Sequence, residues 1–215
     1  MTSRSDHHAL ALPNPRGLWD WGISLSPYSH PYGQLGVELT HTPNGELINS
    51  YKYHSYLRPE RRDGIVRTFT DQVFSAVYEE FHERFPLAEH LPFDICLGPP
   101  ENRETGHSLP REVCRLLSEE REWIIEGFAG IRKTRQASTL KGIPQAERKN
   151  HLAGLYEVNK ETMPYSNFGF LIIDDVFETG STVSSLCETL EEEYPGLPRF
   201  VIALTHLRLA ESSVT

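Results

Sequence analysis

The stretch Phe168–Thr182 constrains the fold most, because an apolar segment runs into two acids and then into a loop of small residues. Residues 168–173 are rich in aromatic and β-branched side chains, which predicts a short strand covered on both faces, as in a parallel sheet. Asp174 and Asp175 follow at once, at the strand end where open α/β sheets bind their ligands. We therefore expect a functional site at the carboxyl end of this strand.

The loop after the acids has the composition of a phosphate-binding loop. It consists of Thr179, Gly180, Ser181 and Thr182, and apolar residues at helical spacing follow it from Val183. A helix start offers unpaired N–H groups and a positive dipole end, both of which suit a phosphate. The spacings of nucleotide triphosphatase and dinucleotide-binding loops are absent. The alternative is that the acids only end a strand and the hydroxyls only cap a helix. We favour the site, because capping does not require two adjacent carboxylates.

This order of strand, acid pair and Thr-Gly-Ser-Thr loop resembles the motif that binds phosphoribosyl pyrophosphate in type I phosphoribosyltransferases. The resemblance implies that Asp174 and Asp175 hold the ribose 2′- and 3′-hydroxyls. It also implies that residues 179–182 hold the 5′-phosphate.

Composition and charge limit the classes of partner. A chain of 215 residues with 38% hydrophobic residues predicts one sizeable α/β domain. Its net charge of −9 disfavours nucleic acid and anionic membranes, so an anionic ligand must be bound by local positive charge. No apolar leader and no run of about 18 apolar residues is present, and we expect a cytoplasmic protein. The three cysteines, which lie among apolar neighbours, are expected to be buried free thiols.

The amino-terminal part is expected to form an addition to the main domain. We expect a loose arm up to about residue 15, then an aromatic-rich segment that covers an apolar edge or forms a hood over a planar ligand. Asn44-Gly45 predicts a β-hairpin over residues 37–51, outside the core. The predicted division places the arm and hairpin at residues 1–50 and the main domain at 51–215.

The rest of the chain alternates between strand and helix patterns. Helices are predicted over 66–85, 108–122 and 181–194, and strands over 93–97, within 123–128 and over 199–205. A rigid turn, Gly98-Pro99-Pro100-Glu101-Asn102, closes the strand at 93–97. This order predicts a central, mainly parallel sheet flanked by helices.

A basic segment at residues 131–150 is the second chemical signal. It contains six basic residues and one acid, a local charge of +5 in a chain of −9. A solvated charge run would look the same. However, long loops in compact domains are usually functional, and this one should lie at the same sheet edge as the phosphate-binding loop.

Further spacings resemble the ComF group of phosphoribosyltransferases over roughly residues 47–206. They are Arg132-x3-Gln136-x3-Leu140, Arg148-x-Asn150-x5-Tyr156, Asp94-x-x-Leu-Gly-Pro-Pro100 and the pair Lys52-Tyr53. The chain departs from that group in lacking its amino-terminal Cys-x-x-Cys zinc module.

The resemblance implies an enzyme that uses or forms 5-phosphoribosyl 1-pyrophosphate with Mg²⁺ and transfers phosphoribosyl to or from a nitrogenous acceptor, such as a purine-like base. Asp174 and Asp175 would orient the ribose and meet the metal through substrate or water, and Glu178 would face the base. The diphosphate would be bound by the turn and the basic segment, at Gly98, Pro99, Pro100, Arg132, Lys133, Arg135 and Arg148. A homodimer is compatible with this assignment.

Two alternatives stay open. One is a non-catalytic protein that retains the fold to sense a phosphoribosylated ligand. The other is a factor associated with nucleic acid or DNA processing, which the net charge opposes.

Overall fold

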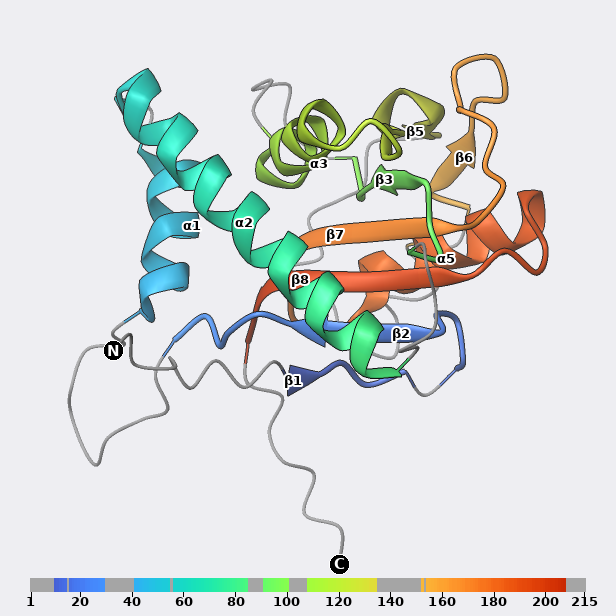
Figure 1. Ribbon diagram of the computed structural model, residues 1–215, viewed down its shortest axis with the longest axis horizontal. Coiled ribbons are helices and arrows are strands. Elements are labelled where there is room, and N and C mark those ends of the chain that lie inside the picture. The colour runs from blue at the N-terminus through green and yellow to red at the C-terminus, as the bar shows by residue number, and fades with distance from the viewer. Residues whose placement is uncertain are drawn as a thin grey trace, which may run out of the picture.

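The computed structural model describes residues 10–14, 16–29, 41–54, 56–84, 91–100, 108–134, 152 and 154–207. Its centre is a six-stranded sheet of order β1-β2-β8-β7-β3-β4 (Figure 1). The strands are β1 (Leu10–Ala11), β2 (Trp21–Ser24), β3 (Ile95–Leu97), β4 (Ile125–Glu126), β7 (Phe170–Phe177) and β8 (Arg199–His206). All neighbouring pairs are parallel except β1 and β2. The predicted α/β class with a mainly parallel central sheet is confirmed.

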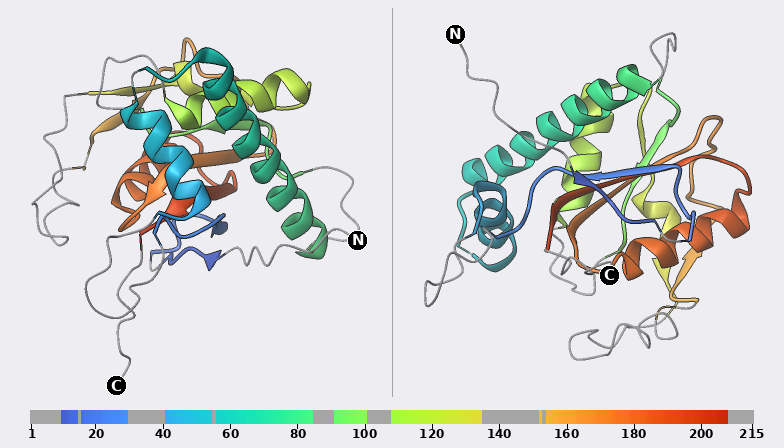
Figure 2. Two further views of the ribbon diagram at one scale, coloured as in Figure 1. Left: turned by 90° about the vertical axis from the view of Figure 1, so that its left-hand side faces the viewer. Right: turned by 90° about the horizontal axis from the view of Figure 1, so that it is seen from below.

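Helices cover both faces of this sheet (Figure 2). The long helix α2 (Pro59–Arg84) and α3 (Leu109–Glu120) pack together on one face, whereas α5 (Ser181–Glu193) lies on the other. Right-handed crossovers require this split, since the chain moves from β3 to β4 in one direction and from β7 to β8 in the opposite one. The strand order therefore reverses between β3 and β7, and ligands of open α/β sheets bind at such a reversal.

The centre of the sheet is dry on both faces. Residues 170–173 of β7 are at most 1% exposed, and residues 201–204 of β8 are fully buried. Phe69 and Val73 of α2 and Leu186 of α5 are also fully buried in the same core. This explains the unbroken apolar run that the sequence shows, because each side chain of a doubly covered strand faces a helix.

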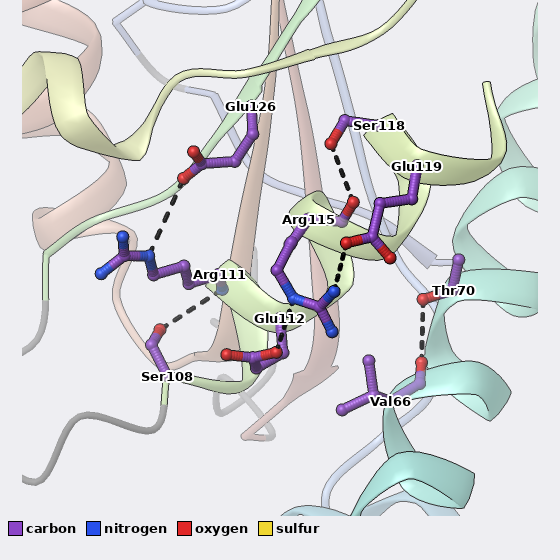
Figure 3. A network of polar contacts seen from close by, with 9 residues as sticks. All are labelled: Val66, Thr70, Ser108, Arg111, Glu112, Arg115, Ser118, Glu119 and Glu126. Atoms are coloured by element: carbon purple, nitrogen blue, oxygen red, sulfur yellow. Dashed lines mark hydrogen bonds and ion pairs between the residues drawn. The ribbon is translucent and has the colours of Figure 1, made fainter. Parts of the chain in front are cut away.

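A surface network of charged side chains holds α3 (Figure 3). Arg115 pairs with Glu112 at 3.0 Å and with Glu119 one turn further on. Arg111 lies 3.8 Å from Glu126 of β4, and the Ser108 hydroxyl accepts the Arg111 N–H at the helix start. Pairs at i, i+3 and i, i+4 stabilise a helix by a few tenths of a kcal/mol each, so this network supports the helix and does not suggest a site.

The predicted hairpin is wrong. Residues 43–53 form the helix α1 (Pro43–Tyr53), with Pro43 in its first turn and Thr42 as its cap. Asn44 serves packing and not a turn, since its side chain exchanges hydrogen bonds with Gln72 of α2. Gly45 is required because a Cβ there would lie 1.9 Å from the Tyr28 carbonyl oxygen. The helix is part of the core, in which Ile48 is fully buried.

The amino-terminal segment contributes a strand to the central sheet. β2 pairs in parallel with β8, and α1 crosses the boundary that the sequence suggested between residues 50 and 51. Of the predicted arm, residues 1–9 and 15 lie outside the described residues, and Leu10–Ala11 forms β1. The three cysteines are buried and free, as predicted.

A small antiparallel pair completes the fold. After the 3-10 turn η1 (Phe128–Gly130), β5 (Ile131–Lys133) pairs with β6 (Tyr156–Val158), which packs on α5. Within the described residues, no helix combines the length and the hydropathy needed to cross a bilayer.

Candidate active site at the carboxyl ends of β3 and β7

Asp174 and Asp175 lie in the last half of β7, where that strand leaves the core. The strand was expected to end before them, but it continues to Phe177 because β8 pairs with it as far as His206. The Asp175 N–H donates to Asp174 Oδ1 at 3.0 Å, and Thr205 of β8 donates to the Asp175 carbonyl at 3.1 Å. The backbone of the acid pair is thus fixed by the sheet.

The environment of Asp174 opposes its ionisation. Burial, and then repulsion from Asp175, raises the pKa of Asp174 to about 7, although Lys52 and the Asp175 N–H act in the other direction. The phenol of Tyr156 on β6 lies near enough for the charge of Asp174, after burial, to raise its pKa. A carboxyl with a perturbed pKa at the end of a central strand is a candidate functional group.

Lys52 of α1 forms an ion pair with Asp175. The side chains are 30% and 16% exposed, so the pair is largely shielded from water. The α1 helix lies beside the sheet end at which β7 and β8 finish (Figure 1). The sequence pointed to Lys52 only as part of a resemblance, because nothing local links residue 52 to residue 175.

The loop that was predicted to bind phosphate, residues 179–182, lies at the start of α5. Gly180 is the cap of α5 with φ 71°, so no side chain caps this helix at that residue. A Cβ on Gly180 would lie 2.6 Å from the ring of Phe177. Thr179 and Ser181 share a hydrogen bond of 2.8 Å between their hydroxyls, and the Ser181 N–H lies 3.4 Å from Thr179 Oγ1. Hydroxyls and helix-start N–H groups therefore lie four to seven residues after the acid pair.

The turn after β3 lies against the same part of β7. Gly98 has no room for a side chain, because a Cβ would lie 2.3 Å from the Ile173 carbonyl oxygen. Pro99 is buried and Pro100 is half-buried. The structure thus brings Gly98, Pro99 and Pro100 beside the acid pair, on the other side of the strand reversal. Residues 101–107 of this turn lie outside the described residues.

The basic segment is described only at its start, over residues 131–134. Arg132 of β5 pairs with Glu157 across the β5–β6 pair, and both side chains are exposed. Lys133 is half-buried in register with Tyr156. Ser185 in the second turn of α5 donates to the Leu152 carbonyl at 2.8 Å, which places Leu152, two residues beyond the segment, beside α5. Arg135 and Arg148 lie outside the described residues.

Glu178 lies between the acid pair and the phosphate-binding loop, and its side chain is exposed. Tyr156 and Lys52 are neighbours of the acid pair that received no role from the sequence. Tyr156 could have been suspected from the alternation of β6, whereas Lys52 is brought in only by the packing of α1.

Other features of the molecule belong to the fold. Asp94 was part of the ComF-like pattern, but it lies at the amino end of β3, where it accepts hydrogen bonds from Ser166, Asn167 and Gly169. A small apolar hollow of about 20 Å³ also lies at the amino ends of the strands, lined in part by Trp21, Phe81, Phe93 and Phe200. Its aromatic walls offer no phosphate-binding group, so it is separate from the site at the acid pair.

The donor set at the acid pair fits a hard divalent cation. Two adjacent carboxylates supply the oxygen ligands that Mg²⁺ prefers, and Mg²⁺ commonly uses one or two carboxylates together with substrate phosphates. Asp174 and Asp175 would hold it, either directly or through water.

Comparisons with known proteins leave the family undetermined. No protein-family model matches the chain, and no curated protein matches it. Among solved structures, a crystal structure of adenine phosphoribosyltransferase is similar at 16% identity, covering 69% of this chain and 73% of that one, with a TM-score of 0.39. Function must therefore be argued from the site.

Proposed function

We propose that the protein is a phosphoribosyltransferase of the type I class, ComF-like in its motifs, which uses or forms 5-phosphoribosyl 1-pyrophosphate with Mg²⁺. The observation that carries the proposal is the acid pair of β7, followed six residues later by the start of α5 with Gly180 at its N-cap, at the point where the strand order reverses. The acceptor would be nitrogenous, such as a purine-like base.

The acids and the loop suit the two ends of a phosphoribosyl group. A carboxylate accepts hydrogen bonds from both hydroxyls of a ribose, and Asp174 and Asp175 are adjacent on a rigid strand. The helix start of α5 would accept the 5′-phosphate through its N–H groups and the hydroxyls of Thr179, Ser181 and Thr182.

Displacement of diphosphate leaves an electron-poor anomeric carbon and a growing negative charge on the leaving group. Such a reaction depends on positioning and on electrostatic stabilisation. Mg²⁺ held by Asp174 and Asp175 would supply positive charge that offsets the growing charge of the leaving group. The Gly98–Pro100 turn would receive the diphosphate beside β7, and the basic segment with Arg132, Lys133, Arg135 and Arg148 would add positive charge.

A second candidate is a protein that binds the same ligand without turnover. The ion pair between Arg132 and Glu157 favours this second candidate. In catalysis the Arg132 guanidinium would bind the leaving group, but in this structure it binds Glu157. Both candidates need the acid pair and the phosphate-binding loop, so only turnover distinguishes them.

The test is pyrophosphate release from phosphoribosyl pyrophosphate and Mg²⁺ across a panel of nucleobases and amines, combined with calorimetric binding. We expect Asp174→Asn with Asp175→Asn to lower the affinity at least about 10³-fold, or roughly 4 kcal/mol, because both ribose contacts are lost. Asp71→Asn, exposed on α2, is the matched control. Binding without release would select the second candidate, and unchanged affinity in the folded double variant would refute the site.

Glu178 is proposed to receive or orient a proton on the acceptor, since it follows the acid pair by three residues. Glu178→Gln is then expected to lower kcat by about 10²–10⁴ with little change in affinity for phosphoribosyl pyrophosphate. Wild-type turnover in both Glu178→Gln and Glu178→Ala would remove Glu178 from the catalytic residues. Tighter substrate binding would instead indicate repulsion of the nearby 5′-phosphate.

A further inference from the structure

The contact between α1 and the acid pair joins two parts of the chain that are far apart in sequence. Lys52 occupies the last turn of α1 and pairs with Asp175 of β7. Both side chains are mostly shielded from water, so this pair is screened less than the exposed pairs of the molecule.

The position of Lys52 is fixed by the packing of α1. The Thr42 hydroxyl accepts the Gly45 N–H at 3.1 Å and donates to the Pro27 carbonyl at 2.6 Å, which anchors the helix start. Asn44 binds Gln72 of α2 at 2.9 Å. Ile48, one turn before Lys52, is fully buried. The backbone of Lys52 is therefore held beside the acid pair by a rigid element, and the flexible stem of its side chain carries the ammonium to Asp175.

Neighbouring groups respond to the same two charges. The phenol of Tyr28 lies near enough to both residues for Asp175 to raise its pKa and for Lys52 to lower it, although burial is the main cause of its raised pKa. The segment that carries Tyr28 also lies against α1, because the Thr42 N–H donates to the Tyr28 carbonyl at 3.1 Å. The ion pair between Lys52 and Asp175 is thus enclosed in part by Tyr28 and its segment, which are themselves held against α1.

We propose that Lys52 is a positioning residue that acts as a built-in counter-cation of the acid pair, so that the site rejects a free divalent cation and accepts a metal only together with an anionic ligand. A bare divalent cation at Asp175 would face the ammonium at close range, and two like charges in a shielded place repel strongly. A complex of the metal with a diphosphate carries net negative charge. The Lys52 ammonium can turn to this complex when Asp175 binds the ribose or its metal. The inference rests on the proposed function, since it assigns the acid pair to a metal-bound ribose.

The test compares two affinities in the full chain, that for free Mn²⁺ by electron paramagnetic resonance and that for the complex of Mg²⁺ with phosphoribosyl pyrophosphate by calorimetry. Lys52→Met keeps the length of the side chain and removes its charge, whereas Lys52→Arg keeps the charge. Lys160→Met is the matched control, because Lys160 pairs with Glu193 at the far end of α5. Circular dichroism checks that each variant is folded, and Lys52→Gln replaces Lys52→Met if the latter is not.

We expect Lys52→Met to bind Mn²⁺ at least about tenfold more tightly than the wild type, a typical size for coupling between two bound charges. Lys52→Arg and Lys160→Met should match the wild type. The gain should disappear in Lys52→Met combined with Asp175→Asn, which a general effect on the fold would not produce.

Equal affinity of Lys52→Met and the wild type for Mn²⁺ would overturn the inference, and so would a gain that survives Asp175→Asn. The outcome is separate from that of the proposed function. If neither the wild type nor any variant binds phosphoribosyl pyrophosphate, the proposed function fails. The Mn²⁺ affinities still decide whether Lys52 weakens the binding of a free divalent cation at the acid pair.

Discussion

A shielded aspartate lies at each end of the central strands, Asp94 at the amino ends (the amino edge of the sheet) and Asp174 near the carboxyl ends (the carboxyl edge). The groups that surround the two carboxylates differ. At the amino edge, Asp94 accepts hydrogen bonds at 2.6 Å from Ser166 Oγ, at 2.8 Å from the Asn167 N–H and at 3.5 Å from the Gly169 N–H. At the carboxyl edge, Asp174 has a neighbouring carboxylate, and its pKa is raised to about 7. A carboxylate surrounded by donors stabilises the fold, whereas one held beside a like charge is available to a ligand.

The largest effect expected from this contrast is on stability. Asp94→Asn should lower the free energy of unfolding by about 3 kcal/mol, because buried N–H and O–H donors lose a charged acceptor and meet an amide. Asp174→Asn should not lower it, since it removes a disfavoured charge. Urea denaturation measures both. A loss of similar size at Asp174 would remove the distinction between the two edges.

The second effect concerns pH. Because the pKa of Asp174 is raised in the folded protein from 3.8 to about 7, the folded state binds more protons than the unfolded state between these values. Stability from this group is therefore full below about pH 4 and is lost as the pH rises towards 7.

Relative to the wild type, Asp174→Asn should become progressively more stable over the same interval, and the difference should be constant above it. The measurement is the free energy of unfolding of both proteins at several pH values from 4 to 8. A difference that does not change with pH would show that Asp174 ionises as freely as an exposed aspartate.

The smallest expected effect is the difference in stability loss between alanine substitutions at two glycines with positive φ. Gly180 (φ 71°) begins α5 at the carboxyl edge and would bring a Cβ within 2.6 Å of Phe177, whereas Gly196 (φ 80°) precedes β8 and has open space around it. Alanine at either position strains the backbone, but only Gly180→Ala also displaces a buried ring. We expect Gly180→Ala to be less stable than Gly196→Ala by about 1 kcal/mol, measured by thermal unfolding. Equal losses would mean that Phe177 moves aside freely.

The elements that carry the site could be predicted because their patterns are local. The buried strand, the acid pair and the start of α5 follow one another within fifteen residues, so one stretch of sequence defines β7 and its loop. The strand proved longer than predicted because Asp174, Val176 and Phe177 remain paired with β8, although the acid pair is polar. Pairing with a neighbouring strand is not visible in the strand's own composition.

The helix α1 and the contact of Lys52 with Asp175 could not be predicted, because both depend on contacts between residues far apart in the sequence. Asn44-Gly45 is a strong local hairpin signal, but Pro43 and the Thr42 cap start a helix, and the glycine serves the close approach of Tyr28. Lys52 was expected directly after this hairpin, where no contact with Asp175 was predicted, but it lies in the last turn of α1 and reaches Asp175 from there. Tertiary contacts decided both.

The pairing of β2 with β8 has a consequence for how the chain folds. The Arg199 N–H donates to the Asp20 carboxylate across 179 residues of sequence, and β2 finds its only parallel partner in the last described strand. During synthesis, Trp21–Ser24 therefore cannot form its parallel pairing until Arg199–His206 has been made and released from the ribosome. Long-range parallel pairing of this kind slows folding, so closure of β2 onto β8 should be a late step, with α2, α3 and β3 assembled before it.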